Sequence, residues 1–145
     1  MLYHIPSIIT PELLYAMRAM GHGDELLITD ANFPATSHGR EYIRLSGVNS
    51  SEALSAILTL LPIDTFVENP FITMETVDHP EIVPSTVEDF TQIIQKKTNF
   101  TARPIGLDRF GFYQRAKQAF VIIQTSDIRP YANIMVKKGV INHAD

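Results

Sequence analysis

Apolar positions along the chain switch repeatedly between helical spacing and short continuous runs. Leu13, Leu14, Met17 and Met20 follow the spacing of one helix face, and Thr10-Pro11 supplies a cap and a favourable first helical position. The same reasoning predicts three further helices: one capped by Asn49-Ser50, one opened by the capping-box pattern Ser85–Glu88, and a short one over Phe112–Ala119.

The continuous apolar runs predict strands between these helices. They cover Glu25–Thr29, Tyr42–Leu45, Phe71–Val77, Ile105–Leu107, Phe120–Thr125 and Ile134–Val136, and residues 31–39 are expected to be loop. Strands that are apolar throughout are typical of a sheet covered on both faces. We therefore predict one α/β domain over residues 1–145, with helices on both sides of a largely parallel sheet.

Composition and charge narrow the function classes. The chain has 145 residues, is 45% hydrophobic and carries a net charge of −4, which excludes a disordered chain. The absence of cysteine excludes disulfides, thiolate metal sites and a cysteine nucleophile. Basic clusters are limited to Lys96-Lys97 and Lys137-Lys138, and no apolar run approaches the ~20 residues of a membrane span. We expect a soluble, cytoplasmic domain with neither a nucleic-acid nor a membrane partner.

Familiar cofactor motifs are missing from the sequence. The five histidines show no metal-ligand spacing, and neither a phosphate-binding loop nor a dinucleotide fingerprint is present. Ser37 and Ser46 lack the context of a nucleophile elbow. We therefore expect no metal and no cofactor.

Two candidate residues flank the first predicted strand. His22 lies between Gly21 and Gly23, where small neighbours leave an imidazole accessible for proton transfer near neutral pH; it could equally help to end the preceding helix. Asp30 ends the strand, at the kind of edge where open α/β sheets bind ligands, although it could instead cap a turn through Asn32.

Further candidates lie in the second half of the chain. Arg109 and Tyr113 occupy a strand-to-helix junction, where they could bind a ligand or act as a surface ion-pairing residue and a packed aromatic. Tyr131-Ala132-Asn133 precedes the last strand, where backbone groups and an amide could hold hydroxyl groups or simply form a turn.

Three blocks in order resemble signatures of the L-fucose mutarotase and D-ribose pyranase family. The first is Gly21–Glu25 (GHGDE) with Thr29–Ala35 (TDANFPA), and the second is Arg109–Phe120 (RFGFYQRAKQAF). The third is Tyr131–Ile134 (YANI) followed by Lys137–Val140 (KKGV). The blocks span nearly the whole chain.

This resemblance implies a three-layer α/β/α fold and a ring-shaped homo-oligomer, typically a decamer, with sites at subunit interfaces. It implies a cofactor-free isomerase that interconverts the anomers of a free monosaccharide. Carried over by motif, His22 is the catalytic acid/base and Tyr113 a further catalytic or binding candidate. The sugar-binding positions are Asp30, Arg109, Tyr131, Ala132 and Asn133.

The branch of the family is indicated by mixed features. Arg109, the Phe112–Lys117 run and Glu25 resemble the fucose branch, whereas Ala132 stands where that branch usually has glycine and the ribose branch has alanine. L-Fucose is therefore the expected sugar. The alternatives are a D-ribose pyranase and a non-catalytic sugar-binding protein of the same fold.

Overall fold

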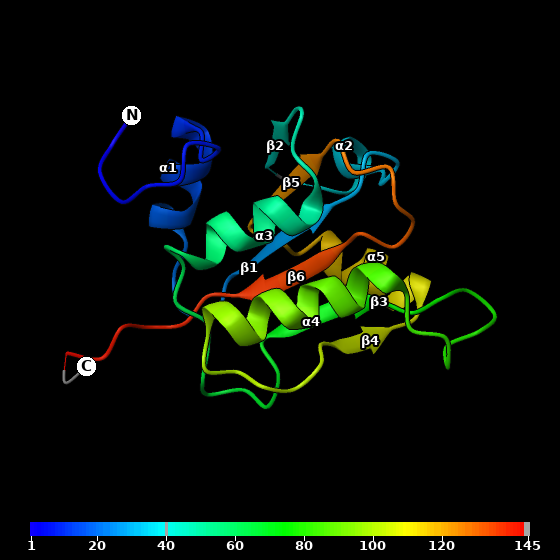
Figure 1. The fold of residues 1–145 in the computed structure, drawn as a ribbon. Helices are drawn as coiled ribbons and strands as arrows, with labels where there is room; N and C mark the ends of the chain where they lie inside the picture. Colours follow the sequence, from blue (N-terminus) through cyan, green and yellow to red (C-terminus); the bar gives the residue numbers. More distant parts are fainter. Residues whose placement is uncertain (40, 144–145) are drawn as a thin grey trace.

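A computed structural model describes residues 1–39 and 41–143. Six strands form one sheet in the order β2-β5-β1-β6-β3-β4, which Figure 1 shows from top to bottom. The strands are β1 (Glu25–Thr29), β2 (Tyr42–Leu45), β3 (Phe71–Met74), β4 (Ile105–Leu107), β5 (Val121–Thr125) and β6 (Ile134–Lys137). The sheet is mixed and mostly parallel, so the predicted fold class is confirmed.

Strand β6 alone among the six runs against its neighbours, β1 and β3. The pairs β1–β5, β2–β5 and β3–β4 are parallel. Residues 126–133 join β5 to β6, fewer than the dozen or so that a parallel crossover needs. The chain therefore re-enters the sheet from the edge at which β5 ends, and β6 begins beside the end of β1.

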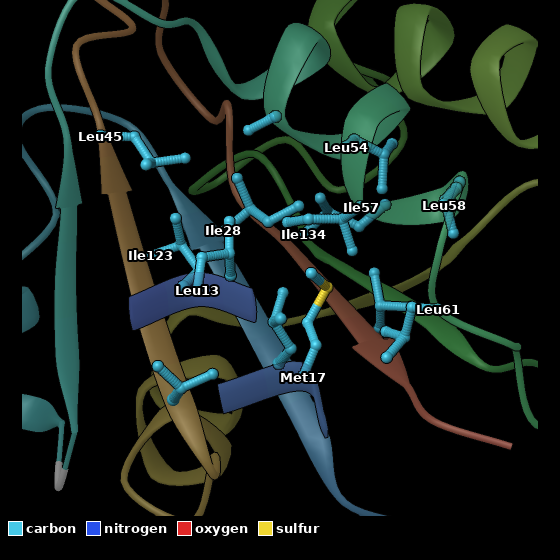
Figure 2. Close-up of a cluster of buried hydrophobic side chains, with 14 of the residues drawn as sticks. Leu13, Met17, Ile28, Leu45, Leu54, Ile57, Leu58, Leu61, Ile123 and Ile134 are labelled. Atoms are coloured by element: carbon cyan, nitrogen blue, oxygen red, sulfur yellow. The ribbon is translucent and has the colours of Figure 1, made fainter. Parts of the chain in front are cut away.

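Helices cover both faces of the sheet. Helices α1 (Pro11–Ala19), α3 (Ser50–Leu58) and α4 (Ser85–Lys97) pack on one face, and α2 (Ala35–His38) and α5 (Arg109–Ala116) on the other (Figure 1). In Figure 2, Leu13 and Met17 of α1 and Ile57 of α3 converge on Ile28 and Ile134 of the sheet. The opposite face buries a smaller cluster around Phe112. The two cores make both faces of the central strands apolar, as the continuous runs indicated.

The capping predictions had different outcomes. Thr10 caps α1, and Asn49 forms a capping box with Glu52 at the start of α3. The capping box predicted from Ser85 is wrong, because Pro84 takes the cap position and Ser85 is already helical.

Three predicted boundaries also need correction. Residues 35–38 form the short helix α2 rather than loop. Strand β3 ends at Met74 instead of Val77: the Glu75 N–H still donates to the Leu107 carbonyl at 2.7 Å, but the Val77 N–H donates to the Tyr131 hydroxyl and not to a strand. Helix α5 begins at Arg109 instead of Phe112, because Asp108 Oδ1 accepts the N–H of Gly111 at 2.7 Å and caps the helix earlier.

Candidate functional site

The carboxyl end of β1 carries a reciprocal pair, Asp30 and Asn133. The Asp30 N–H donates to Asn133 Oδ1 at 2.9 Å, and Asn133 Nδ2 donates to Asp30 Oδ2 at 3.0 Å. The Asn32 N–H donates to Asp30 Oδ1 at 2.9 Å, so the turn role foreseen for Asp30 is real. Both side chains are buried, and the pair joins the end of β1 to the start of β6.

The Asp30 carboxylate retains acceptor capacity. Burial raises the pKa of Asp30 above its usual value, although hydrogen bonds from Asn32 and Asn133 oppose the shift. The Phe33 N–H also opposes the shift, and the two carboxylate oxygens offer about four acceptor sites, more than these three donors use. Asp30 can therefore accept hydrogen bonds from ligand hydroxyls, and it is more basic than an exposed aspartate.

Tyr131 holds a strained backbone beside this pair. Its φ is 59°, in the left-handed region, which costs a non-glycine residue on the order of 1 kcal/mol. Thr86 Oγ1 donates to the Tyr131 carbonyl at 3.1 Å, and the Tyr131 hydroxyl accepts the Val77 N–H at 3.0 Å. These contacts fix the segment before β6 against the loop after β3.

Ala132 differs from its neighbours because its side chain lies in the core. The residue is fully buried, and its methyl group belongs to the hydrophobic cluster under α3. Its carbonyl accepts a hydrogen bond from Ser50 Oγ at 2.7 Å. Ala132 therefore shapes the segment through its backbone and packing.

Arg109 and Tyr113 lie on the first turns of α5. The Arg109 guanidinium carbon is 5.4 Å from the centre of the Tyr113 ring, a cation–π arrangement. The Tyr113 ring packs against Phe33, 5.5 Å away, and His38, 5.1 Å away. Phe33 follows Asp30 in the same turn, so the aromatic contacts link Arg109 to the Asp30 segment.

A cavity of about 300 Å³ lies next to Arg109. Val77, whose N–H binds the Tyr131 hydroxyl, lines this cavity together with Glu75 and Asp108. The volume is at the lower end of the range for small-molecule sites. The strand directions bring the carboxyl ends of β1 and β4 and the start of β6 to one edge of the sheet, so Asp30, the first turns of α5 with Arg109 and Tyr113, and the 131–133 segment lie at that edge.

His22 lies in a second cluster, with Asp64 and Phe66. Its Nε2 is 3.1 Å from Asp64 Oδ1, and its ring centre is 5.3 Å from that of Phe66. Burial alone would raise the pKa of Asp64, but hydrogen bonds from the Phe66 N–H and from His22 hold that pKa below its usual value. An ionised carboxylate only accepts, so Nε2 carries the hydrogen and Nδ1 is left to exchange a proton. The His22 side chain is 44% exposed.

Close backbone packing builds this second cluster. Gly23 has a φ of 87°, and its N–H donates to the Lys138 carbonyl at 2.9 Å. Lys138 Nζ in turn donates to the carbonyls of Met17 and Met20 at the end of α1. A side chain at Gly139 would lie 2.2 Å from the Ile63 carbonyl oxygen, so glycine is required for this contact.

The two clusters lie at opposite edges of the sheet. His22 precedes β1 and Asp30 follows it, and the five residues of β1 span about 16 Å at ~3.3 Å per residue. Strand β6 shows the same separation, because Asn133 precedes it and Lys138 follows it. One copy of the chain therefore does not bring His22 to the other predicted site residues.

Asp64 and Phe66 had no signal in the sequence. They lie 42 and 44 residues after His22, in an irregular segment between α3 and β3. Neither residue belongs to a periodic run or to a known motif. Their role becomes visible only when the fold places this segment against the Gly21–Gly23 turn.

Two further observations concern cofactors and membranes. Within residues 1–39 and 41–143, no three His, Asp or Glu side chains gather closely enough to hold a metal ion. In the same part of the chain, no helix combines the length and apolar character needed to cross a bilayer.

The chain is similar to known proteins over nearly its whole length. Fucose mutarotase of Bos taurus is 39% identical over 97% of this chain and 95% of its own length. Fucose mutarotase of Streptococcus pneumoniae, solved in complex with L-fucose, superposes with a TM-score of 0.91 and 38% identity, covering 97% of this chain and all of that one. Bacillus subtilis RbsD, solved with D-ribose, shares the fold, with a TM-score of 0.76, 18% identity and coverage of 98% and 100%. Residues 3–141 match the model of the RbsD / FucU transport protein family, and the chain belongs to this family.

Proposed function

We propose that this protein is a cofactor-independent mutarotase that interconverts the α and β anomers of free L-fucose. The observation that carries the proposal is the buried Asp30–Asn133 pair at the carboxyl end of β1, found in a chain similar over its full length to fucose mutarotases. The pair can accept and donate hydrogen bonds to ring hydroxyls, and Arg109 can only donate. L-Fucose anomer exchange, followed by saturation-transfer NMR, tests the proposal. A sugar-binding protein would perturb the resonances without accelerating exchange.

The reaction needs two proton transfers. One group removes the proton from the anomeric hydroxyl while another protonates the ring oxygen, so the ring opens to the aldehyde and recloses on the other face. His22 is one proton carrier and acts through Nδ1, while Asp64 accepts the hydrogen bond from Nε2–H and so orients the imidazole ring. Tyr113, next to Arg109, is the candidate for the second proton carrier.

We further propose that each complete site forms between two copies of the chain. The support is geometric, since His22 and Asp30 occupy opposite ends of β1 and one proton carrier must reach the bound sugar. Phe66, 73% exposed beside His22, offers an apolar surface for such a contact. Contacts that join different surfaces of identical subunits form a ring when the rotation between neighbours closes, in keeping with the decamer that the family resemblance implies. A cytoplasmic location stays a prediction, to be checked by cell fractionation.

Anomer exchange should survive metal removal. Proton transfer between side chains and sugar oxygens requires no Lewis acid, so exhaustive dialysis against EDTA is expected to leave the exchange rate unchanged. The same NMR assay, run before and after dialysis, measures this. Loss of activity that one divalent metal restores would contradict the mechanism.

L-Fucose should be exchanged faster than D-ribose at equal concentration. Arg109 and the Phe112-Tyr113 pair favour this order, and the Ala132 methyl group lies in the core. Ala132→Gly should therefore keep the ranking while lowering the unfolding free energy by about 1 kcal/mol. Exchange rates for both sugars, with melting of both proteins, test this. If the wild-type protein exchanges D-ribose faster than L-fucose, the ribose pyranase alternative is favoured. If the order of the two sugars changes only in Ala132→Gly, Ala132 has a direct role in specificity.

A further inference from the structure

Asp127 is hydrogen-bonded to the segment that carries Asp30 and, through Ser50, to the segment that carries Asn133. It follows the end of β5, and 3% of the residue is exposed. Its carbonyl accepts the N–H of Ala31 at 2.9 Å, and its own N–H donates to Thr125 Oγ1 at 3.1 Å. Thr125 Oγ1 donates in turn to the Thr29 carbonyl at 2.7 Å. The backbone on both sides of Asp30 is therefore bonded to the Thr125–Asp127 segment.

The Asp127 carboxylate reaches the other half of the pair through Ser50. Asp127 Oδ2 accepts the Ser50 N–H at 3.0 Å, at the first residue of α3, where a helix favours a negative charge. The Ser50 hydroxyl donates to the Ala132 carbonyl at 2.7 Å, one residue before Asn133. Ala31 and Ala132, the neighbours of Asp30 and Asn133, are thus held by one continuous set of hydrogen bonds.

Arg129 completes the surroundings of this carboxylate. Its Nε donates to Asp127 Oδ1 at 3.0 Å and its Nη2 to Oδ2 at 2.8 Å, while Nη1 pairs with the half-exposed Asp89 at 2.6 Å. Burial alone would raise the pKa of Asp127, but the hydrogen bonds from Arg129 and Ser50 hold it below its usual value. The carboxylate is therefore ionised at neutral pH and keeps accepting from both donors.

We propose that Asp127 is a positioning residue for sugar binding, which acts through Ser50 to set the geometry of the Asp30–Asn133 pair. This inference rests on the proposed function, because the pair is taken to hold the sugar hydroxyls. The pair contacts hydroxyls in both the ground state and the transition state. Loosening it therefore weakens substrate binding more than it slows the proton transfers.

The test compares Ser50→Ala, Asp127→Asn and the control Asp89→Asn. Ser50→Ala removes the hydroxyl that donates to the Ala132 carbonyl and contacts Thr125 Oγ1 at 3.1 Å, but it keeps the Ser50 N–H on Asp127. It should raise the Kd and KM for L-fucose about three- to tenfold, the usual range for one lost hydrogen bond, with a smaller change in kcat. Asp127→Asn replaces one accepting oxygen by an amide N–H₂ that faces an N–H donor of Ser50 or Arg129, so Kd and KM should rise further. Asp89→Asn removes the charge of the outer partner of Arg129 and should leave Kd and KM unchanged.

Calorimetric binding of L-fucose and NMR exchange are measured on each folded variant, at a temperature well below its melting point. Ser50→Ala keeps the test decisive if Asp127→Asn fails to fold. A folded Ser50→Ala with Kd and KM within about twofold of wild type would overturn the role of Asp127. A wild type that binds L-fucose without exchanging it would refute the mutarotase function, while the Kd series still tests Asp127. A wild type that neither binds nor exchanges would overturn both proposals.

Discussion

His22→Ala should lower L-fucose anomer exchange by about 10²–10⁴-fold, the effect expected when a general acid/base is lost. Sugar affinity should fall far less, because Asp30, Asn133 and Arg109 lie at the other edge of the sheet. The fold should survive, since the His22 side chain is 44% exposed and Asp64 keeps its hydrogen bond from the Phe66 N–H. The measurement is NMR exchange, with binding and thermal melting on the same sample.

His4→Asn is the matched control for this variant. His4 is exposed and has a φ of 64°, which asparagine tolerates well. The control should retain wild-type exchange. If His22→Ala is folded and exchanges normally, His22 has no part in proton transfer; if it unfolds, the residue is needed to end α1 and build the turn.

Mixing two inactive variants should restore activity if sites are shared between copies. His22→Ala leaves an intact Asp30 edge, and Asp30→Asn leaves an intact His22 edge. In randomly mixed oligomers roughly a quarter of the interfaces would join two intact edges, so exchange should approach roughly a quarter of the wild-type rate. The subunits are mixed by mild dissociation and reassembly, and exchange is then measured by NMR.

Two controls make the mixing result specific. A double variant carrying His22→Ala and Asp30→Asn, taken alone through the same dissociation and reassembly, should stay inactive. Mixing Asp30→Asn with Arg109→Ala should also fail to recover, because both residues lie at the same edge of the sheet and one copy must supply both. Recovery in this second mixture, or none in the first, would contradict a site shared between copies.

The sequence predicted the helices and strands well where periodicity or a cap determines them. Strand β1 appears with its predicted bounds, and α1 starts at its predicted cap, Thr10. Errors arose where one local contact decides a boundary, as when Asp108 starts α5 at Arg109. The reversed direction of β6 depends on a short connection over the neighbouring strand, which an apolar run does not reveal.

The candidate site was predictable residue by residue but not as an arrangement. The residues at the Asp30 edge were named from motifs, and the fold brings Asp30 to Asn133, 103 positions later. The predicted strand Glu25–Thr29 already separates His22 from Asp30 by its own length, but no motif showed that Lys138 packs against the His22 turn. Asp127 carried a readable signal, since it follows an apolar strand as Asp30 does. Asp64 lies in irregular chain and carried none.

The reversed strand β6 gives each copy a fixed polarity. Asn133 precedes this strand, and Lys138, whose backbone binds the His22 turn, follows it. The length of β6 therefore sets the distance between the Asp30 edge and the His22 edge, the two half-sites of one copy. Under the proposed sharing, an open row of copies always leaves an unused half-site at each end, whereas a closed ring leaves none. The anomer-exchange rate per subunit would then depend on whether the ring is closed. Dilution should lower this rate in proportion to the fraction of rings that open.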